Sequence, residues 1–173
     1  TTPTFITEVP LKTSSREQAV LSKRFWAAKQ QYNALLGEAL KRLKHMRHDV
    51  QFSQALKLYR EGNKKEAKPI FKALQKDYRY REYDLYAHCK QWNKKKIFLS
   101  IGARISQQLA KRAFQAVEAY RQGKRGKPRY KGYRGIQSIE DNSITANIRL
   151  KKNTILNTSQ IFLTIHENRI LFY

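Results

Sequence analysis

Apolar residues recur at steps of three and four along the first part of the chain. From position 21 to 46 they are Leu21, Phe25, Ala28, Tyr32, Leu35, Ala39, Leu43 and Met46. This spacing places them on one face and predicts a single long amphipathic helix that ends at about His48. Ser14 and Glu17 have the spacing of a capping box, so the helix is expected to begin there. Gly37 inside it costs roughly 1 kcal/mol relative to Ala unless close packing requires it.

Further helical patterns follow. Residues 53–61 and 64–78 flank a Gly-Asn pair, which predicts two shorter helices joined by a turn. Aromatic residues recur at helical spacing over 78–92, and this stripe is expected to belong to the core rather than to a nucleic-acid platform. Apolar positions from 101 to 120 predict another helix, capped by Ser100 and ended near Gly123.

After Ile136 the apolar period changes to two residues. Alternating positions over 144–150, 161–165 and 170–172 predict an antiparallel meander of half-buried strands. Alternation before Pro10 predicts a short N-terminal strand that pairs with this sheet, because it has nothing else on which to bury its apolar face. The predicted fold class is therefore α+β, a discontinuous antiparallel β domain with an inserted α-helical lobe.

The composition adds a strong positive charge. The 173 residues include 36 Lys and Arg against 13 Asp and Glu, which gives a formal net charge of +23 and an isoelectric point of about 10.3. Such a field favours a polyanionic partner, because binding one relieves self-repulsion and releases counterions. Apolar residues make up 40% of the chain, enough for a packed core.

The sequence also bears on the cellular location of the protein. No apolar run approaches the roughly 20 residues of a membrane-spanning helix, and no signal peptide stands at the start, so we expect an intracellular protein without a membrane partner. Cys89 is the only cysteine, which excludes an internal disulfide and fits a reducing compartment. Because the sequence begins at Thr1 and stops at Tyr173 inside a strand-like pattern, it is expected to be part of a longer chain.

Residues 121–136 carry the clearest candidate chemistry. They include seven Lys or Arg, two Tyr, four Gly and no acid. Cations suit phosphates, Tyr rings suit bases or sugars, and Gly lets the backbone approach a ligand closely. A short charge run is more often a solvated linker, but the interleaved aromatics, the Pro and the charge of the whole chain favour nucleic acid. The predicted contact residues are Arg121, Lys124, Arg125, Lys127, Arg129, Tyr130, Lys131, Tyr133 and Arg134.

Other chemistries find little support in the sequence. The candidate metal ligands are His45, His48, His88 and Cys89. No CxxC pair is present to anchor zinc, so the histidines are expected on the surface and the thiol in the core. Glu140 and Asp141 are the only adjacent carboxylates and are expected in a turn, and they are too few for a metal-dependent nuclease. We therefore predict no catalytic residue and no metal site.

Several short motifs, taken in order, resemble one family. They are Thr13-Ser-Ser-Arg-Glu-Gln18, Phe25, Tyr32-Asn33, Ala113-Phe114, Tyr120, Gly126-Lys-Pro-Arg-Tyr-Lys131 and Ser138-Ile139. In this order they are similar to the N-terminal part of the RNA-guided TnpB nucleases of insertion sequences and of their descendants, the type V CRISPR effectors. The Gly-x-Pro-x-aromatic-Lys segment followed by Ser-Ile is the most specific match.

The resemblance implies a domain plan and a function. Residues 1–13 and 124–173 would form a β-barrel-like wedge domain, and residues 14–123 a helical recognition lobe. In the family these parts bind the guide RNA scaffold and the guide–target heteroduplex and read a short target-flanking motif, for which Gln107 and Gln108 are the candidates here. The implied partners are guide RNA and target DNA in the cytoplasm of a prokaryotic cell, at the nucleoid when DNA is bound.

The resemblance also bears on catalysis. The family's RuvC-like nuclease follows the wedge domain and holds Mg²⁺, so residues 1–173 are expected to bind without cutting and to need no cofactor. Three alternatives remain open: a stand-alone RNA-binding protein of the ribosomal or RNA-chaperone kind, a small metal nuclease that uses Glu140 and Asp141, and a basic adaptor for an acidic protein. Divalent-dependent cleavage would identify the nuclease, and a lack of preference for structured RNA would identify the adaptor.

Overall fold

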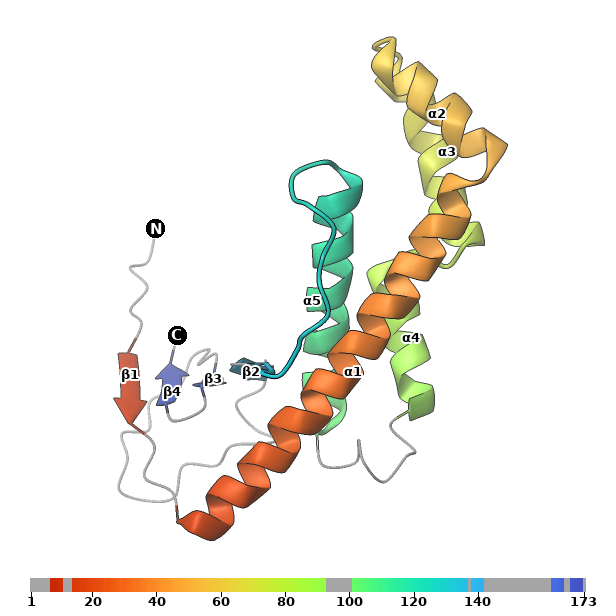
Figure 1. Ribbon diagram of the computed structural model, residues 1–173. Coiled ribbons are helices and arrows are strands. Elements are labelled where there is room, and N and C mark those ends of the chain that lie inside the picture. The colour runs from red at the N-terminus through yellow and green to blue at the C-terminus, as the bar shows by residue number, and fades with distance from the viewer. Residues whose placement is uncertain are drawn as a thin grey trace.

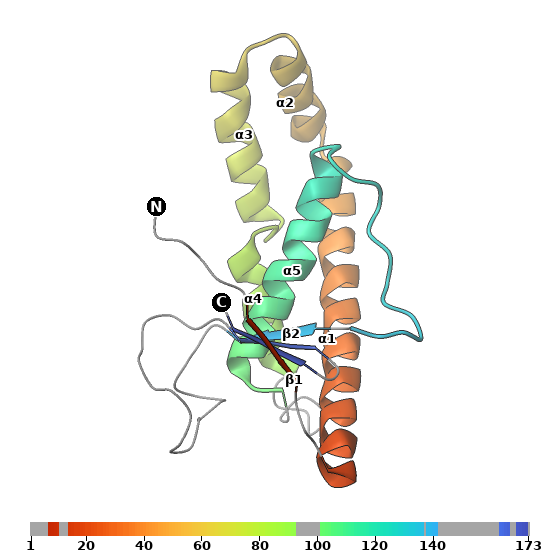
Figure 2. The same cartoon turned by 90° about the vertical axis from the view of Figure 1, so that its left-hand side faces the viewer.

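The computed structural model describes residues 7–10, 14–92, 101–136, 138–141, 163–166 and 169–172, and most of these are helical (Figure 1). The helices described are α1 (Ser15–Arg47), α2 (Val50–Arg60), α3 (Lys64–Asp77), α4 (Glu82–Trp92) and α5 (Ala103–Arg121). Helices α1, α4 and α5 pack against one another, whereas α2 and α3 form a hairpin that projects beyond them (Figure 1, Figure 2).

Helix α1 is one uninterrupted helix of 33 residues, as the apolar spacing predicts. Its predicted capping box is confirmed. The Ser14 hydroxyl accepts a hydrogen bond from the Glu17 backbone N–H at 3.4 Å, and the Glu17 carboxylate accepts one from the Ser14 N–H at 2.8 Å. These bonds satisfy backbone donors that the start of a helix leaves unpaired.

The two predicted shorter helices are confirmed as the α2–α3 hairpin, although α2 begins three residues earlier than predicted. Gly62 ends α2 with φ +91°, and the Asn63 N–H donates to the Leu58 carbonyl at 2.9 Å, which is a Schellman motif. Arg79 ends α3 in the same way with φ +49°. Arg42 of α1 donates to the Arg79 carbonyl at 2.8 Å and so ties the end of α3 to α1.

The core lies between α1, α4 and α5. Its buried side chains include Leu35, Leu36, Ala39, Leu43, Leu85, Leu109, Ala113 and Val117. The aromatic stripe belongs largely to this core, as predicted: Tyr80 is buried, and Tyr78, Tyr86 and Trp92 pack against it. Tyr83 is the exception, because 79% of it is exposed.

The predicted fold class is wrong, because the described chain is mostly helical and forms no barrel. Its strands β1 (Thr7–Pro10), β2 (Ser138–Asp141), β3 (Leu163–His166) and β4 (Arg169–Phe172) have four residues each. They pair antiparallel in the order β1-β4-β3-β2. Among the strands described, β1 and β2 stand at the two edges of the sheet and do not pair with each other, so the sheet does not close. A barrel-like wedge domain is therefore not formed by the residues described.

Two local predictions also need correction. Glu140 and Asp141, expected in a turn, lie in strand β2, where their backbones pair with Thr164 and Leu163. The N-cap of α5 is Gly102 with φ +79° and no side-chain cap, whereas the predicted cap, Ser100, lies outside the described residues. The predicted strand over 144–150 also lies outside them.

Candidate nucleic-acid interface

The basic segment, residues 122–136, connects α5 to β2 and runs back beside α1 (Figure 1, Figure 2). Helix α5 ends in a Schellman motif: the Lys124 N–H donates to the Ala119 carbonyl at 2.9 Å, and the Gly123 N–H donates to the Tyr120 carbonyl at 3.1 Å. Gly123 has φ +71°, which glycine adopts without steric cost. The end near Gly123 is as predicted, and it reverses the chain so that the segment follows α1.

Asn33 on α1 fixes the middle of the basic segment. Its Oδ1 accepts a hydrogen bond from the Lys131 N–H at 2.8 Å, and its Nδ2 donates to the Lys131 carbonyl at 2.9 Å. We name these two bonds the Asn33 clamp. One turn further along α1, Tyr130 lies over Gly37, where an added Cβ would stand 3.2 Å from the Tyr130 hydroxyl. Ile136, only 2% exposed, anchors the end of the segment in the core.

The clamp leaves the cations of the segment in solvent. The exposed ones are Lys124, Arg125, Lys127, Arg129, Lys131 and Arg134. Within the described residues none of the six takes part in an ion pair. Tyr130 is 59% exposed and Tyr133 is fully exposed. The structure therefore brings eight of the nine predicted contact residues onto one extended strip.

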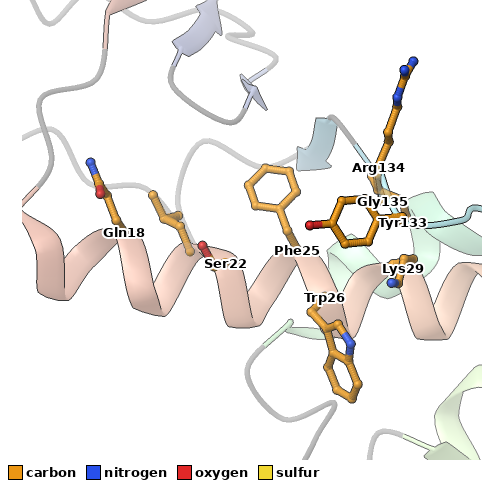
Figure 3. Close-up of a pocket in the computed structure, with 10 residues that line it drawn as sticks. Gln18, Ser22, Phe25, Trp26, Lys29, Tyr133, Arg134 and Gly135 are labelled. Carbon is orange, nitrogen blue, oxygen red and sulfur yellow. The ribbon is translucent and has the colours of Figure 1, made fainter.

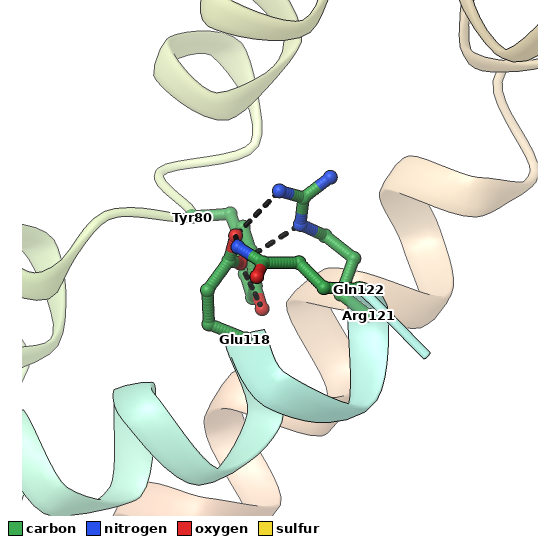
Figure 4. Close-up of polar contacts among 4 residues, drawn as sticks. All are labelled: Tyr80, Glu118, Arg121 and Gln122. Carbon is green, nitrogen blue, oxygen red and sulfur yellow. Dashed lines mark hydrogen bonds and ion pairs between the residues drawn. The ribbon is translucent and has the colours of Figure 1, made fainter. Parts of the chain in front are cut away.

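Arg121 is set apart from the other predicted contact residues. Its Nε donates to Glu118 Oε2 at 2.8 Å, its Nη2 donates to Oε1, and the Tyr80 hydroxyl and the Gln122 amide also donate to this carboxylate (Figure 4). Burial acts to raise the pKa of Glu118, but the hydrogen bonds from Arg121 and Gln122 outweigh it and hold the pKa below its usual value. Arg121 thus pairs within the helical core at the end of α5.

The basic segment, α1 and the end of α5 enclose a hollow of about 600 Å³, the Tyr130 hollow. The cations that line it are Lys41, Lys44, Arg47 and Lys127, and the rings are those of Tyr120 and Tyr130. The Arg47 guanidinium lies over the Tyr120 ring, with Cζ 4.8 Å from the ring centroid. Among the residues described, no carboxylate lines this hollow. Leu40, Leu43, His48 and Pro128 also line it, so its walls combine apolar surface and two Tyr rings with cations.

A second hollow of about 440 Å³, the Tyr133 hollow, lies at the other end of the segment (Figure 3). Phe25, Trp26 and Lys29 of α1 line it together with Tyr133 and Arg134. A turn closed by the Gly135 N–H, which donates to the Gly132 carbonyl at 3.0 Å, presents these two segment residues. Trp26 is 47% exposed, so this hollow also joins aromatic and cationic side chains.

The predicted motif-reading residues are not part of either hollow. Gln107 and Gln108 are half-buried in the first turns of α5, and neither lines the Tyr130 hollow or the Tyr133 hollow. Their role therefore stays a prediction.

The candidate metal ligands are not brought together. Of the residues that the structure describes, no three His, Cys, Asp or Glu gather where they could hold a metal ion. Cys89 is buried and accepts a hydrogen bond from Gln31 Nε2 at 2.8 Å, and burial raises the pKa of the thiol to about 11. His88 packs edge-on against Trp92, and Glu140 lies 3.7 Å from the Arg112 guanidinium. Cys89, His88 and Glu140 thus have structural partners, whereas His45 and His48 are exposed and His48 lines the Tyr130 hollow.

Sequence reasoning missed the contribution of α1 to this surface. It did not single out Asn33 as a clamp or the cations Lys41, Lys44 and Arg47 as walls of a hollow. One signal was available, because a glycine inside a long helix needs a packing reason. Gly37 has that reason in the ring of Tyr130.

None of the described helices is long and apolar enough to cross a membrane. No protein-family model matches the chain, and comparisons with curated proteins and with solved structures give no match. The functional argument therefore rests on the residues themselves.

Proposed function

We propose that this chain binds structured RNA through the basic segment, and that this RNA is the guide of an RNA-guided DNA-targeting system. The observation that carries the proposal is the Asn33 clamp, which holds a strip of six exposed cations in a fixed path along α1. Cations held in register suit the regular phosphates of a nucleic-acid strand, because each contact releases counterions without a further cost of ordering the segment.

Aromatic side chains favour nucleic acid over other polyanions. Tyr130 and Tyr133 alternate with the cations of the segment, and both are exposed. A base or a sugar can pack on such a ring, whereas an acidic protein offers only carboxylates to the cations. RNA is favoured because its loops and bulges present unstacked bases.

Guide RNA and target DNA are proposed from the order of the motifs that resembles the TnpB and type V CRISPR family. The helical part, which supplies both the clamp and α5, corresponds in that order to the recognition lobe. A stand-alone RNA-binding protein would use the same strip. The two functions predict different competition experiments. A guide–target RNA–DNA heteroduplex should displace a bound RNA hairpin better than an RNA duplex of the same length does only in the RNA-guided case.

The test is RNA affinity as a function of salt. If about five phosphates are neutralised, the slope of log K against log salt should be on the order of −4 to −5 for duplex-like RNA. Arg129→Ala and Lys131→Ala should each weaken binding by roughly 1 kcal/mol or more and flatten the slope by about one unit. A slope near zero, or unchanged affinity in the double variant, would refute the proposal.

Two matched controls separate the strip from general charge. Lys65→Ala and Lys68→Ala remove exposed lysines of α3, on the hairpin that projects away from the segment, and should leave RNA affinity within about twofold. Arg121→Ala should lower the melting temperature because Glu118 loses its partner, but it should leave the salt slope unchanged. Equal losses in all variants would mean a non-specific polycation.

A further inference from the structure

We infer that the Tyr130 hollow holds one unstacked nucleotide of the bound RNA, with the base against the rings and the phosphate among the lysines. The inference rests on the proposed RNA binding and adds to it a site for single-stranded RNA at a defined place. The Tyr130 hollow lies beside the exposed strip, since Lys127 and Tyr130 belong to both.

The size of the hollow suits a nucleotide. It measures about 600 Å³, within the roughly 300–1,000 Å³ of pockets that bury small ligands. Gly37 lines the hollow, and an added Cβ there would stand 3.2 Å from the Tyr130 hydroxyl, so a side chain at this position would have to displace Tyr130. With glycine at position 37, Tyr130 keeps its place beside α1 and stays 59% exposed.

The walls suit a base. Tyr130 offers a ring on the side of the segment, and Arg47 stacked on Tyr120 offers a guanidinium plane on the side of α5. Aromatic rings and guanidinium planes are the surfaces on which proteins stack unpaired bases of RNA. A base inside a duplex has both faces covered by its neighbours, so only a nucleotide outside the duplex can use these walls.

The charges suit its phosphate. Lys41 and Lys44 are exposed one turn apart on α1, and Lys127 approaches from the segment. Lysine binds phosphate as a point charge without a fixed orientation, and no described carboxylate lines the hollow to compete with it. The ligand is therefore anionic and aromatic at once, which a nucleotide is.

The test compares a blunt RNA hairpin, closed by a non-nucleotide linker so that it has no unpaired base, with the same hairpin carrying a short single-stranded uridine extension, by fluorescence anisotropy on residues 1–173. The extension should tighten binding roughly fivefold to a hundredfold, the contribution of a stacked base. Tyr130→Ala should abolish this gain, whereas Tyr130→Phe, which keeps the ring, should retain it. Tyr83→Ala removes an exposed aromatic of α4 that lines neither hollow, so it is the matched control and should also retain the gain.

A second variant covers the case in which Tyr130→Ala disturbs the segment. Lys41→Gln together with Lys44→Gln changes only exposed side chains, so the fold should be kept. It should reduce the gain from the extension and flatten the salt slope for the extended RNA more than for the blunt hairpin.

The outcomes separate the two proposals. Failure of the blunt hairpin to bind refutes the proposed function, and oligouridine alone, with and without Tyr130→Ala, then tests the hollow. Binding of the hairpin with no gain from the extension overturns only this inference. A gain that Trp26→Ala removes and Tyr130→Ala keeps also overturns it, as does a uridine mononucleotide that binds as tightly as the extension, because the hollow would then be a site for free nucleotide.

Discussion

Removal of the Asn33 clamp should weaken RNA binding without changing a single charge. In Asn33→Ala the Lys131 N–H and carbonyl lose bonds of 2.8 and 2.9 Å. Each is worth roughly 0.5–1.5 kcal/mol net, and the better helix propensity of alanine returns up to about 0.7 kcal/mol. The expected loss of folding stability is therefore about 1–2 kcal/mol, which for a chain of this size lowers the melting temperature by roughly 2–8 °C.

The same free energy appears in RNA binding if RNA requires the ordered segment. Apparent affinity scales with the fraction of molecules in which the segment is ordered. If the clamp alone keeps it ordered, affinity for structured RNA should fall by up to roughly 5- to 30-fold, since about 1.4 kcal/mol corresponds to a factor of ten. Affinity for heparin and the salt slope for RNA should stay nearly unchanged, because all six cations are still present. Thermal melts and salt titrations on the same preparations measure both quantities.

The control is Gln30→Ala, which removes an amide from α1 three residues before the clamp and should leave both quantities near the parent values. If Asn33→Ala lowers the melting temperature but binds RNA within twofold of the parent, the path of the segment is irrelevant and the cations act only as charge. If neither quantity moves, the clamp does not exist in solution.

Three further results are expected. Residues 1–173 should cleave neither RNA nor DNA with Mg²⁺ or Mn²⁺, and cleavage lost in Glu140→Gln or Asp141→Asn would contradict this. Cys89, with a pKa raised by burial to about 11, should react with a thiol reagent at pH 8 only in denaturant, and rapid reaction of the native protein would count against its burial. The lowered pKa of Glu118 means that its pairing with Arg121 stabilises the fold above the unfolded value of about 4.3 and that this is lost as pH falls through the folded pKa. Glu118→Gln should therefore be less stable than the parent in urea at pH 7 and closer to it at pH 3, and an equal deficit at both pH values would refute the assignment.

The helices were predictable because their signals are local. The capping box at Ser14 and the glycine at position 62 act within a few residues, and the apolar period of α1 is set by its own face. The sheet was predictable in part. Alternation indicated the N-terminal strand and the antiparallel strands near 161–165 and 170–172, which β1, β3 and β4 form, with β1 paired to the sheet as expected. Strand β2 was missed, because four residues that include two adjacent acids carry little apolar periodicity. The barrel came from the resemblance alone, and the described strands do not form it.

The candidate interface was likewise predictable only where its signals are local in the sequence. The exposed cations and rings of the segment could be named from the sequence because charge and aromatic interleaving are properties of the segment itself. The clamp could not, because Asn33 and Lys131 lie 98 positions apart. The ion pair of Arg121 could have been predicted, since Glu118 lies three residues before it and oppositely charged residues at that spacing meet on a helix.

Because α1 is continuous, it holds the two hollows at a fixed distance from each other. A helix rises about 1.5 Å per residue, so Phe25 in the Tyr133 hollow and Lys41 in the Tyr130 hollow are held roughly 24 Å apart along its axis. A strand that reaches from one hollow to the other must span this distance. A shorter oligonucleotide can occupy one end or the other, and a longer one engages both. Affinity should therefore rise stepwise with ligand length at that size, as a property of the helix and not of the ligand sequence.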